Sequence, residues 1–171
     1  MIRLGALFAV VFGAMLVEAR RAASNEKSQR ARGGIEPRHD VYALMQVAYP
    51  GVFLAMLGEG LFRQPPPPSV LAAGIVGFTL GKLLKWWAIV TLGPFWTFRV
   101  IVVPGSTAVS GGPYKYLRHP NYVGVLGELI GSALIAGAPV AGTLGTALFA
   151  GLMLMRVRVE NRALNAILRR G

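Results

Sequence analysis

The chain contains five apolar segments, each close to the length that crosses a membrane as a helix. These segments are residues 1–17, 42–62, 69–90, 122–138 and 139–155, and the last two are short. About 20 residues span the hydrocarbon core of a bilayer as a helix, and an open strand would leave its backbone groups unpaired there. The sequence therefore predicts an all-α polytopic membrane protein with about five transmembrane helices in one domain, residues 1–171.

Composition excludes several other classes of protein. Of the 171 residues, 54% are hydrophobic and only 15% are charged, whereas a soluble domain carries roughly 25% charged residues. A disordered basic tail would lack this apolar content. The chain has no cysteine, which excludes a disulfide scaffold and any Cys-based metal or redox site. No metal site is expected.

The positive charges predict one orientation in the membrane. The net charge is +11, and with the N-terminus outside, all but two of the 18 Lys and Arg residues fall on the inner side, leaving Arg3 and Arg63 outside. This distribution follows the positive-inside rule. Topology therefore explains the charge without nucleic-acid binding, which we do not expect. We expect a multi-pass protein of a bacterial plasma membrane, with its N-terminus outside and its C-terminus in the cytoplasm.

The stretch between the third and fourth segments, residues 82–122, is unusual. Lys82 and Lys85 precede two tryptophans, so we expect their ammonium groups to reach the cytoplasmic boundary. Residues 95–103 mix aromatic and β-branched side chains with one arginine. That mixture favours an interfacial segment over a sixth transmembrane helix.

A glycine-rich, aromatic motif, residues 111–124, lies at the start of the fourth segment. Tyr114 and Tyr122 supply ring faces and hydroxyls, and His119 supplies a ring nitrogen. Pro120 is expected in the first turn of the fourth helix, whose free N–H groups attract a carboxylate. Such a cluster at the membrane boundary suits a polar cofactor with an aromatic base. A capping turn with interfacial tyrosines is the alternative.

Two glutamates stand out among the few acidic residues. Glu128 lies near the middle of the fourth segment, where an unpaired charge is expensive, so we expect it to be protonated, hydrogen-bonded or paired within the bundle. Glu160 follows Arg156 by one helical turn, so the two side chains share a face and can form an i,i+4 ion pair. Arg156 and Glu160 both lie where the fifth helix leaves the membrane, beside the boundary that carries His119.

These motifs resemble the isoprenylcysteine carboxyl methyltransferase family. The resemblance rests on residues 112–124, with the block Arg118-His119-Pro120-Asn121-Tyr122, and on residues 156–161. Members of that family are integral membrane enzymes that move a methyl group from S-adenosylmethionine to a lipidic acceptor. The resemblance therefore implies a methyltransferase with S-adenosylmethionine as cofactor, and a lipidic small molecule and membrane lipids as partners.

The resemblance also implies roles for individual residues. The implied cofactor-binding residues are Ser106, Thr107, Ala108, Val109, Tyr114, His119, Pro120, Asn121, Tyr122 and Glu160. Arg156 matches the arginine that orients the acceptor's carboxylate, so it is the expected catalytic and substrate-binding residue, with Glu128 as a second substrate-binding candidate. The chain departs from the pattern at Ser106, where the family often has histidine, and at Asn161, where a second acidic residue is common.

The N-terminal half resembles one branch of the family more loosely. Glu18, the Asn25-Glu26 pair and residues 33–36 look like bacterial members that methylate alkylpyrones or alkylresorcinols made by type III polyketide synthases. Val41 and Tyr49 stand where those relatives tend to have histidines. The expected acceptor is therefore a carboxylate or an acidic hydroxyl on a prenylcysteine-like or alkylpyrone-like molecule.

Two other functions remain open from the sequence. Membrane sterol and steroid reductases carry a similar Tyr-Arg-His-Pro-Asn-Tyr block and use NADPH, whose 2′-phosphate would favour extra basic residues. A non-catalytic lipid-binding subunit would also tolerate Asn161 and the serine at position 106. Binding of S-adenosylhomocysteine or of NADPH distinguishes these possibilities.

Overall fold

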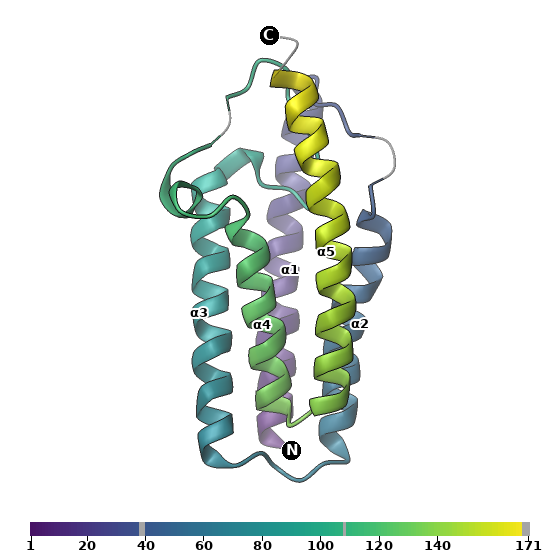
Figure 1. Ribbon diagram of the computed structural model, residues 1–171, viewed down its shortest axis with the longest axis vertical. Helices are drawn as coiled ribbons and strands as arrows, with labels where there is room; N and C mark the ends of the chain where they lie inside the picture. The colour runs from purple at the N-terminus through teal and green to yellow at the C-terminus, as the bar shows by residue number, and fades with distance from the viewer. Residues whose placement is uncertain (38–39, 108, 169–171) are drawn as a thin grey trace.

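Five long α-helices run alongside one another and form a bundle (Figure 1). The computed structural model describes residues 1–37, 40–107 and 109–168, with side chains up to residue 163. The helices are α1 (Ile2–Ala31), α2 (Tyr42–Leu61), α3 (Pro68–Leu92), α4 (Pro120–Ala136) and α5 (Pro139–Leu168). Two short 3-10 helices, η1 (Gly93–Phe95) and η2 (Gly112–Lys115), lie in the long connection between α3 and α4. The predicted all-α architecture is confirmed.

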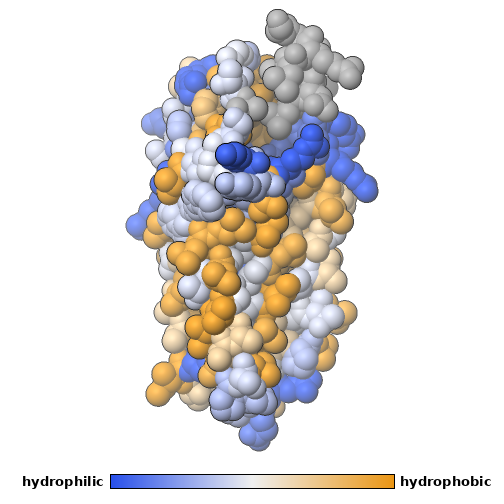
Figure 2. Space-filling view, turned by 60° about the vertical axis from the view of Figure 1, so that its left-hand side comes forward, coloured by the Kyte–Doolittle hydropathy of each residue, from blue (hydrophilic) through white to orange (hydrophobic). Residues whose placement is uncertain are grey.

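The helices have the length and composition of membrane spans. α1, α2, α3 and α5 each contain a window that is long and apolar enough to cross a bilayer, and α4 is a shorter apolar helix of 17 residues. On the face that Figure 2 shows, hydrophobic side chains form a band across the middle of the molecule, and hydrophilic side chains gather toward its ends. The chain is therefore a multi-pass membrane protein, as the sequence predicted.

Helix ends follow local sequence in some places and not in others. α4 begins at Pro120, its predicted first-turn residue, and ends before Gly137, which has a left-handed φ of 66°. α1 and α5 extend well beyond the predicted ends at residues 17 and 155. The hydropathy falls at those positions, but neither helix meets a residue that would break it. After residue 17 of α1, the first glycine or proline is at position 33, and after residue 155 of α5 there is none before its end at residue 168.

Figure 1 shows which connections share an end of the bundle. The N-terminus lies at one end with the α2–α3 and α4–α5 connections. The α1–α2 connection, the α3–α4 connection and the C-terminal end of α5 lie at the other, here called the motif end. Because α1 and α5 extend past the apolar band there, Glu26 and Glu160 are positioned beside the α3–α4 connection.

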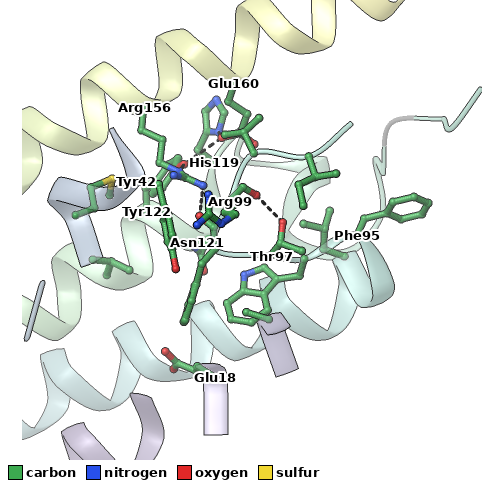
Figure 3. Close-up of a pocket in the computed structure, with 18 of the residues that line it drawn as sticks. Glu18, Tyr42, Phe95, Thr97, Arg99, His119, Asn121, Tyr122, Arg156 and Glu160 are labelled. Carbon is green, nitrogen blue, oxygen red and sulfur yellow. Dashed lines mark hydrogen bonds and ion pairs between the residues drawn. The ribbon is translucent and has the colours of Figure 1, made fainter. Parts of the chain in front are cut away.

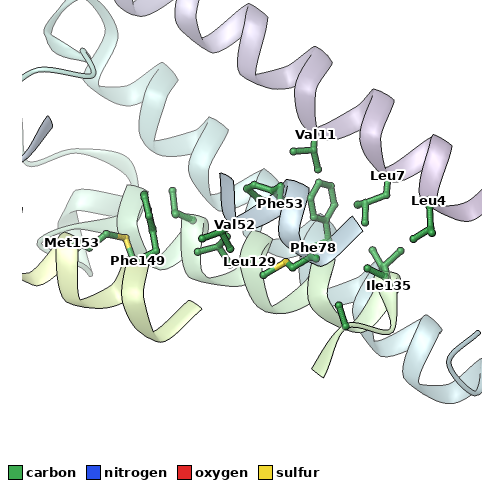
Figure 4. Close-up of a cluster of buried hydrophobic side chains, with 14 of the residues drawn as sticks. Leu4, Leu7, Val11, Val52, Phe53, Phe78, Leu129, Ile135, Phe149 and Met153 are labelled. Atoms are coloured by element: carbon green, nitrogen blue, oxygen red, sulfur yellow. The ribbon is translucent and has the colours of Figure 1, made fainter. Parts of the chain in front are cut away.

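α3 and α4 pack closely because glycines line their contact. A Cβ atom on Gly81 would lie 2.7 Å from the carbonyl oxygen of Gly124 and 2.8 Å from the amide nitrogen of Glu128. No side chain fits at that separation, so the glycines of α4 serve close helix contact. The buried apolar core lies beside this contact and draws on all five helices (Figure 4). Leu7, Phe53, Phe78, Leu129 and Phe149 represent the five helices in it.

A cluster of four charged side chains interrupts this apolar interior. We call Glu18, Lys82, Lys85 and Glu128 the charged quartet. Lys85 Nζ lies 2.6 Å from Glu18 Oε2 and 3.5 Å from Glu128 Oε2, and Lys82 Nζ lies 3.3 Å from Glu18 Oε1 and 3.0 Å from Glu128 Oε1. The Tyr49 hydroxyl donates to Glu128 Oε2 at 2.7 Å. α1, α2, α3 and α4 all contribute to this cluster.

The quartet corrects one prediction and confirms another. The ammonium groups of Lys82 and Lys85 do not extend outward from the helix toward water, because each pairs with two carboxylates inside the bundle. Glu128 is paired within the bundle, as predicted. Two ammonium groups and two carboxylates sum to zero charge, and all but Lys82 have side chains no more than 4% exposed. A buried charge is tolerated only with such compensation.

Removing one charge from the quartet should destabilise the fold more than removing two. Lys85→Met leaves two buried carboxylates with one ammonium group, and breaking a buried pair in this way costs about 3–5 kcal/mol. Adding Glu18→Gln restores the balance and retains the Lys82–Glu128 pair. We therefore expect thermal unfolding in detergent to show a higher midpoint for the double variant than for Lys85→Met alone. A lower midpoint for the double variant would show that charge compensation is not what the quartet provides.

Candidate functional site

A cavity of about 1020 Å³ lies inside the bundle at the motif end. Its wall on α5 runs from Asn161 to Phe149, about 18 Å at the helical rise per residue. The volume is at the upper limit of the roughly 300–1,000 Å³ that encloses one drug-sized ligand. The cavity is therefore as large as sites that enclose a whole ligand, and it joins the polar motif end to the apolar interior.

The cavity has a polar mouth, an apolar middle and a charged floor. The mouth is lined by Ser106, Thr107, Val109, Tyr114, Arg118, His119, Asn121, Tyr122, Arg156, Glu160 and Asn161. Apart from Gln46, the middle is lined by apolar side chains, namely Phe12, Met15, Leu16, Met45, Pro50, Val125, Phe149 and Met153. Glu18, Tyr49 and Lys85 form the floor. Figure 3 shows Arg156, Tyr122, His119 and Glu160 close together and Glu18 apart from them.

Polar side chains from α1 position the α3–α4 connection over the cavity. Asn25 Nδ2 donates to the carbonyl oxygens of Gly93 and Trp96 at 3.0 and 2.8 Å, and Gln29 Nε2 donates to that of Pro94 at 3.0 Å. These bonds satisfy carbonyl groups of η1 and of Trp96, the residue that follows it, directly after the end of α3. The extension of α1 beyond the membrane therefore serves to hold this connection in place.

The α1–α2 connection also contacts the α3–α4 connection. Ile35 and Val102 exchange backbone hydrogen bonds of 2.9 and 3.0 Å, and Glu36 accepts a hydrogen bond of 2.8 Å from Arg99. Burial raises the pKa of Glu36, but hydrogen bonds from Arg99 and Arg30 outweigh that effect and leave the pKa below its usual value. Glu36 is therefore ionised at neutral pH and keeps Arg99 paired.

The predicted cofactor-binding segment before the motif lies at the cavity mouth. Ser106, Thr107 and Val109 line it, and Ala108 lies outside the described residues. The Ser106 backbone N–H and hydroxyl both donate to the Val103 carbonyl, at 3.1 and 2.6 Å. A tight turn therefore brings this segment to the cavity.

The aromatic motif residues converge at the mouth. Burial and, to a lesser extent, the charge of Glu160 together raise the pKa of Tyr114 to about 12, so the hydroxyl is a neutral hydrogen-bond donor at neutral pH. His119 caps the N-terminus of α4, and its ring lies 5.5 Å from the Tyr122 ring. The buried His119 Nε2 and Asn121 Oδ1 have no hydrogen-bond partner among the described residues.

A chain of hydrogen bonds connects α5 with α4. Arg156 Nε donates to the Tyr122 hydroxyl at 3.1 Å, and that hydroxyl donates to Glu160 Oε2 at 3.1 Å. Glu160 Oε2 also lies 3.7 Å from His119 Nδ1. Among the described ion pairs, the predicted i,i+4 pair between Arg156 and Glu160 does not occur, because Tyr122 lies between the two groups and Arg156 has another carboxylate partner.

That partner is Asp40, which lies two residues before α2. Arg156 Nη1 donates to both Asp40 oxygens at 3.2 and 3.0 Å, and Nη2 donates to the Phe98 carbonyl. The two charged side chains are only 7% and 6% exposed. Arg156 thus connects α5 with α4, with the start of α2 and with the α3–α4 connection.

Glu160 differs from the other acidic residues. Each of the other six lies within 4 Å of a lysine or arginine nitrogen, whereas in the described part of the chain Glu160 has only His119 as a partner that can carry a positive charge. Its side chain is 32% exposed. The Glu160 carboxylate is therefore available to a ligand in the cavity mouth.

Two predicted site residues lie outside the cavity wall. Pro120 is buried as the first residue of α4, where it aligns the residues that follow. Glu128 lies behind Lys85 and Tyr49, so it reaches the cavity only through those side chains. In the part of the chain that the structure describes, no group of three or more His, Asp or Glu residues is placed to hold a metal ion.

Sequence reasoning missed Asp40 as a site residue, and it missed the floor residues Lys85 and Tyr49. One signal was available for Asp40, because it is the chain's sole aspartate and an acidic residue is costly near apolar segments. Its partner, however, lies 116 residues away. No local pattern identifies that pairing.

Comparison with known proteins shows which family this chain resembles. The sequence profile of the Isoprenylcysteine carboxyl methyltransferase (ICMT) family matches residues 72–166, a range that includes the motif, Arg156 and Glu160. The uncharacterized protein YpbQ of Bacillus subtilis (strain 168) is 31% identical over 159 residues, which cover 92% of this chain and 94% of that protein. An uncharacterized protein of Haemophilus influenzae (strain ATCC 51907 / DSM 11121 / KW20 / Rd) is 23% identical over 142 residues, covering 82% and 83% of the two chains. No solved structure matches. The chain belongs to the isoprenylcysteine carboxyl methyltransferase family.

Proposed function

We propose that this protein is an S-adenosylmethionine-dependent methyltransferase that acts on an oxygen of a lipidic acceptor at the membrane. Membership of a methyltransferase family supports the reaction class. The observation that carries the proposal is the cavity itself, which has a polar mouth at the motif end and an apolar middle within the bundle. A polar cofactor and a lipidic acceptor fit these two regions.

The residues at the mouth suit S-adenosylmethionine. The aromatic rings of Tyr114 and Tyr122 offer stacking faces for an adenine base. Glu160, which has no lysine or arginine partner in the described chain, suits ribose hydroxyls or the positive sulfonium. The unpartnered polar atoms of His119 and Asn121 lie in the same wall. S-adenosylmethionine, when bound, would supply an electrophilic methyl group there.

The apolar middle of the cavity suits the chain of an acceptor. Phe12 and Leu16 of α1 and Met45 and Pro50 of α2 line it, and α1 and α2 contact each other much less than α3 and α4 do. Leu16 is 63% exposed, so the wall between α1 and α2 extends to the lipid-facing surface. A prenylcysteine-like or alkylpyrone-like acceptor would enter from the membrane on this side.

The charges of the reaction explain why such a cavity would accelerate it. When the acceptor oxygen attacks a sulfonium methyl group, the positive charge of the sulfonium is dispersed in the transition state. Removing water and aligning the two reactants therefore supply most of the rate enhancement. The Arg156–Tyr122–Glu160 chain spans the mouth at the level where the polar and apolar regions meet. We assign methyl transfer to that level.

Binding of S-adenosylhomocysteine to the purified protein in detergent tests the cofactor assignment. We expect Tyr114→Ala and Glu160→Ala each to weaken binding about tenfold or more, because a stacked base contributes about 1–3 kcal/mol and a hydrogen bond to a charged group about 1.5–3 kcal/mol. Isothermal titration calorimetry measures both. Tyr116→Ala is the matched control, since Tyr116 is 74% exposed and lies outside the cavity wall.

The same titration with NADPH separates a methyltransferase from a reductase. Arg99, Lys85 and Arg156 line the cavity, but each already pairs with a carboxylate, so they are poor anchors for a 2′-phosphate. Arg118 is the remaining cation of the wall, and a single exposed guanidinium that water screens is a weak anchor. We expect no NADPH binding. Preference for NADPH over S-adenosylhomocysteine would contradict the proposal, and binding of neither would favour a non-catalytic subunit.

We further propose that the motif end faces the cytoplasm and the N-terminus lies outside, in a bacterial plasma membrane. The α1–α2 connection, the α3–α4 connection and the end of α5 share the motif end, and they carry most of the 18 basic residues. Basic connections remain on the cytoplasmic side. S-adenosylmethionine, a cytoplasmic metabolite, would then reach the cavity mouth directly.

Single cysteines test this orientation, because the chain has no cysteine of its own. Gln64→Cys lies in the α2–α3 connection and Lys115→Cys lies in η2, and both positions are exposed. We expect a membrane-impermeant maleimide to label Gln64→Cys in intact cells, and to label Lys115→Cys only after permeabilisation. The opposite pattern would reverse the proposed orientation.

A further inference from the structure

The guanidinium of Arg156 is already occupied by groups of the protein. Asp40 accepts from Nη1 with both carboxylate oxygens, the Tyr122 hydroxyl accepts from Nε and the Phe98 carbonyl accepts from Nη2. A carboxylate is held bidentately by two neighbouring N–H groups of a guanidinium. No such free pair is left on Arg156, so an incoming carboxylate would have to displace Asp40.

Displacing Asp40 would be unfavourable. Its side chain is only 6% exposed, and Arg156 is the cation with which it pairs. Once displaced, Asp40 would be a buried and uncompensated charge, which is strongly destabilising. While the pair is intact, the positive charge of Arg156 is neutralised before any acceptor arrives.

The other cations in the cavity interior are compensated in the same way. Lys85 pairs with Glu18 and Glu128 in the charged quartet. Arg99 pairs with Glu36 at 2.8 Å. An acceptor that enters from the apolar middle therefore meets no unpaired cation at Lys85, Arg99 or Arg156. Arg118 also lines the cavity and has no carboxylate partner among the described residues, but it lies exposed at the mouth, where water screens its charge. An ionised head group would lose its hydration without gaining a counter-charge, whereas an uncharged hydroxyl would not.

We infer that Asp40 determines the specificity of the cavity: by neutralising Arg156, it makes the cavity select a lipid with an uncharged hydroxyl as its reacting group over one with a carboxylate. This inference rests on the proposed methyl transfer and specifies its acceptor class. Asp40 lies behind Arg156, outside the cavity wall. It therefore acts through the charge of Arg156 and does not touch the acceptor.

A hydroxyl acceptor releases a proton, and the structure offers a group to receive it. In the transfer, the acceptor oxygen bonds to the methyl carbon, the carbon–sulfur bond breaks with its electron pair left on sulfur, and the hydroxyl proton passes to the Glu160 carboxylate. Glu160 connects to Arg156 through the Tyr122 hydroxyl. Because its side chain is 32% exposed, Glu160 can return the proton to water.

Two matched lipids test the selection without cofactor or turnover. 4-Dodecylphenol and 4-dodecylbenzoic acid share a ring and a chain, but at pH 7.5 a phenol with a pKa of about 10 is uncharged and a carboxylic acid with a pKa of about 4 is ionised. Binding of each to the full chain in detergent is measured by isothermal titration calorimetry. We expect the wild type to bind the phenol more tightly. Asp40→Asn should shift the affinity ratio toward the benzoate about tenfold or more, the size of one hydrogen bond to a charged group.

Glu36→Gln is the matched control, because it removes one carboxylate from the same end of the molecule without exposing a buried cation. Arg99 keeps Glu26 as a partner at 3.4 Å, and its side chain is 37% exposed and therefore screened by water. We expect it to leave the ratio nearly unchanged. The wild-type preference tests the inference even if Asp40→Asn does not fold. Tighter wild-type binding of the benzoate, binding of neither probe, or equal ratios in wild type and Asp40→Asn would overturn it. Binding of S-adenosylhomocysteine by the wild type, measured separately, reports on the proposed function.

Discussion

The burial of one guanidinium group organises the motif end of this protein. Arg156 brings together α4 through Tyr122, the start of α2 through Asp40 and the α3–α4 connection through the Phe98 carbonyl. The Arg156 side chain is only 7% exposed. Its guanidinium requires all of these partners, since each buried N–H group without an acceptor would destabilise the fold. The cavity mouth therefore has its shape because elements far apart in the sequence must meet around this group. Glu160, one turn further along α5, is held at the same mouth by Tyr122.

The cavity floor is built on the same principle of compensated charge. Glycines allow α3 and α4 to approach until Gly81 contacts the α4 backbone, and this places Lys82 and Lys85 against Glu128 and, across the bundle, against Glu18. The quartet is neutral, so it offers polarity to the cavity without net charge. An apolar chamber between two compensated polar ends is suited to a lipid with a polar but uncharged head. It is poorly suited to a free fatty anion.

Local sequence predicted the features that depend on local physics. Apolar length predicted the helices, Pro120 predicted the start of α4, and the resemblance carried by the motif predicted the residues that line the cavity mouth. It failed where a partner is remote. Lys82 and Lys85 were expected at the membrane boundary because long side chains usually reach water, yet Glu18, 67 residues from Lys85, retains them inside. Asp40 and Arg156 are likewise 116 residues apart, and a single sequence contains no signal for such a pair.

Transfer of a labelled methyl group tests the central claim most directly. The purified protein is incubated with S-adenosylmethionine labelled in its methyl group and a lipid extract of cells that carry the gene, and the organic phase is counted before and after treatment with alkali. Label in the organic phase that resists alkali is predicted, because methyl transfer to a hydroxyl gives an ether. Label released by alkali as methanol would indicate a methyl ester and contradict the hydroxyl acceptor. The absence of label from the organic phase would contradict methyl transfer to a lipid altogether.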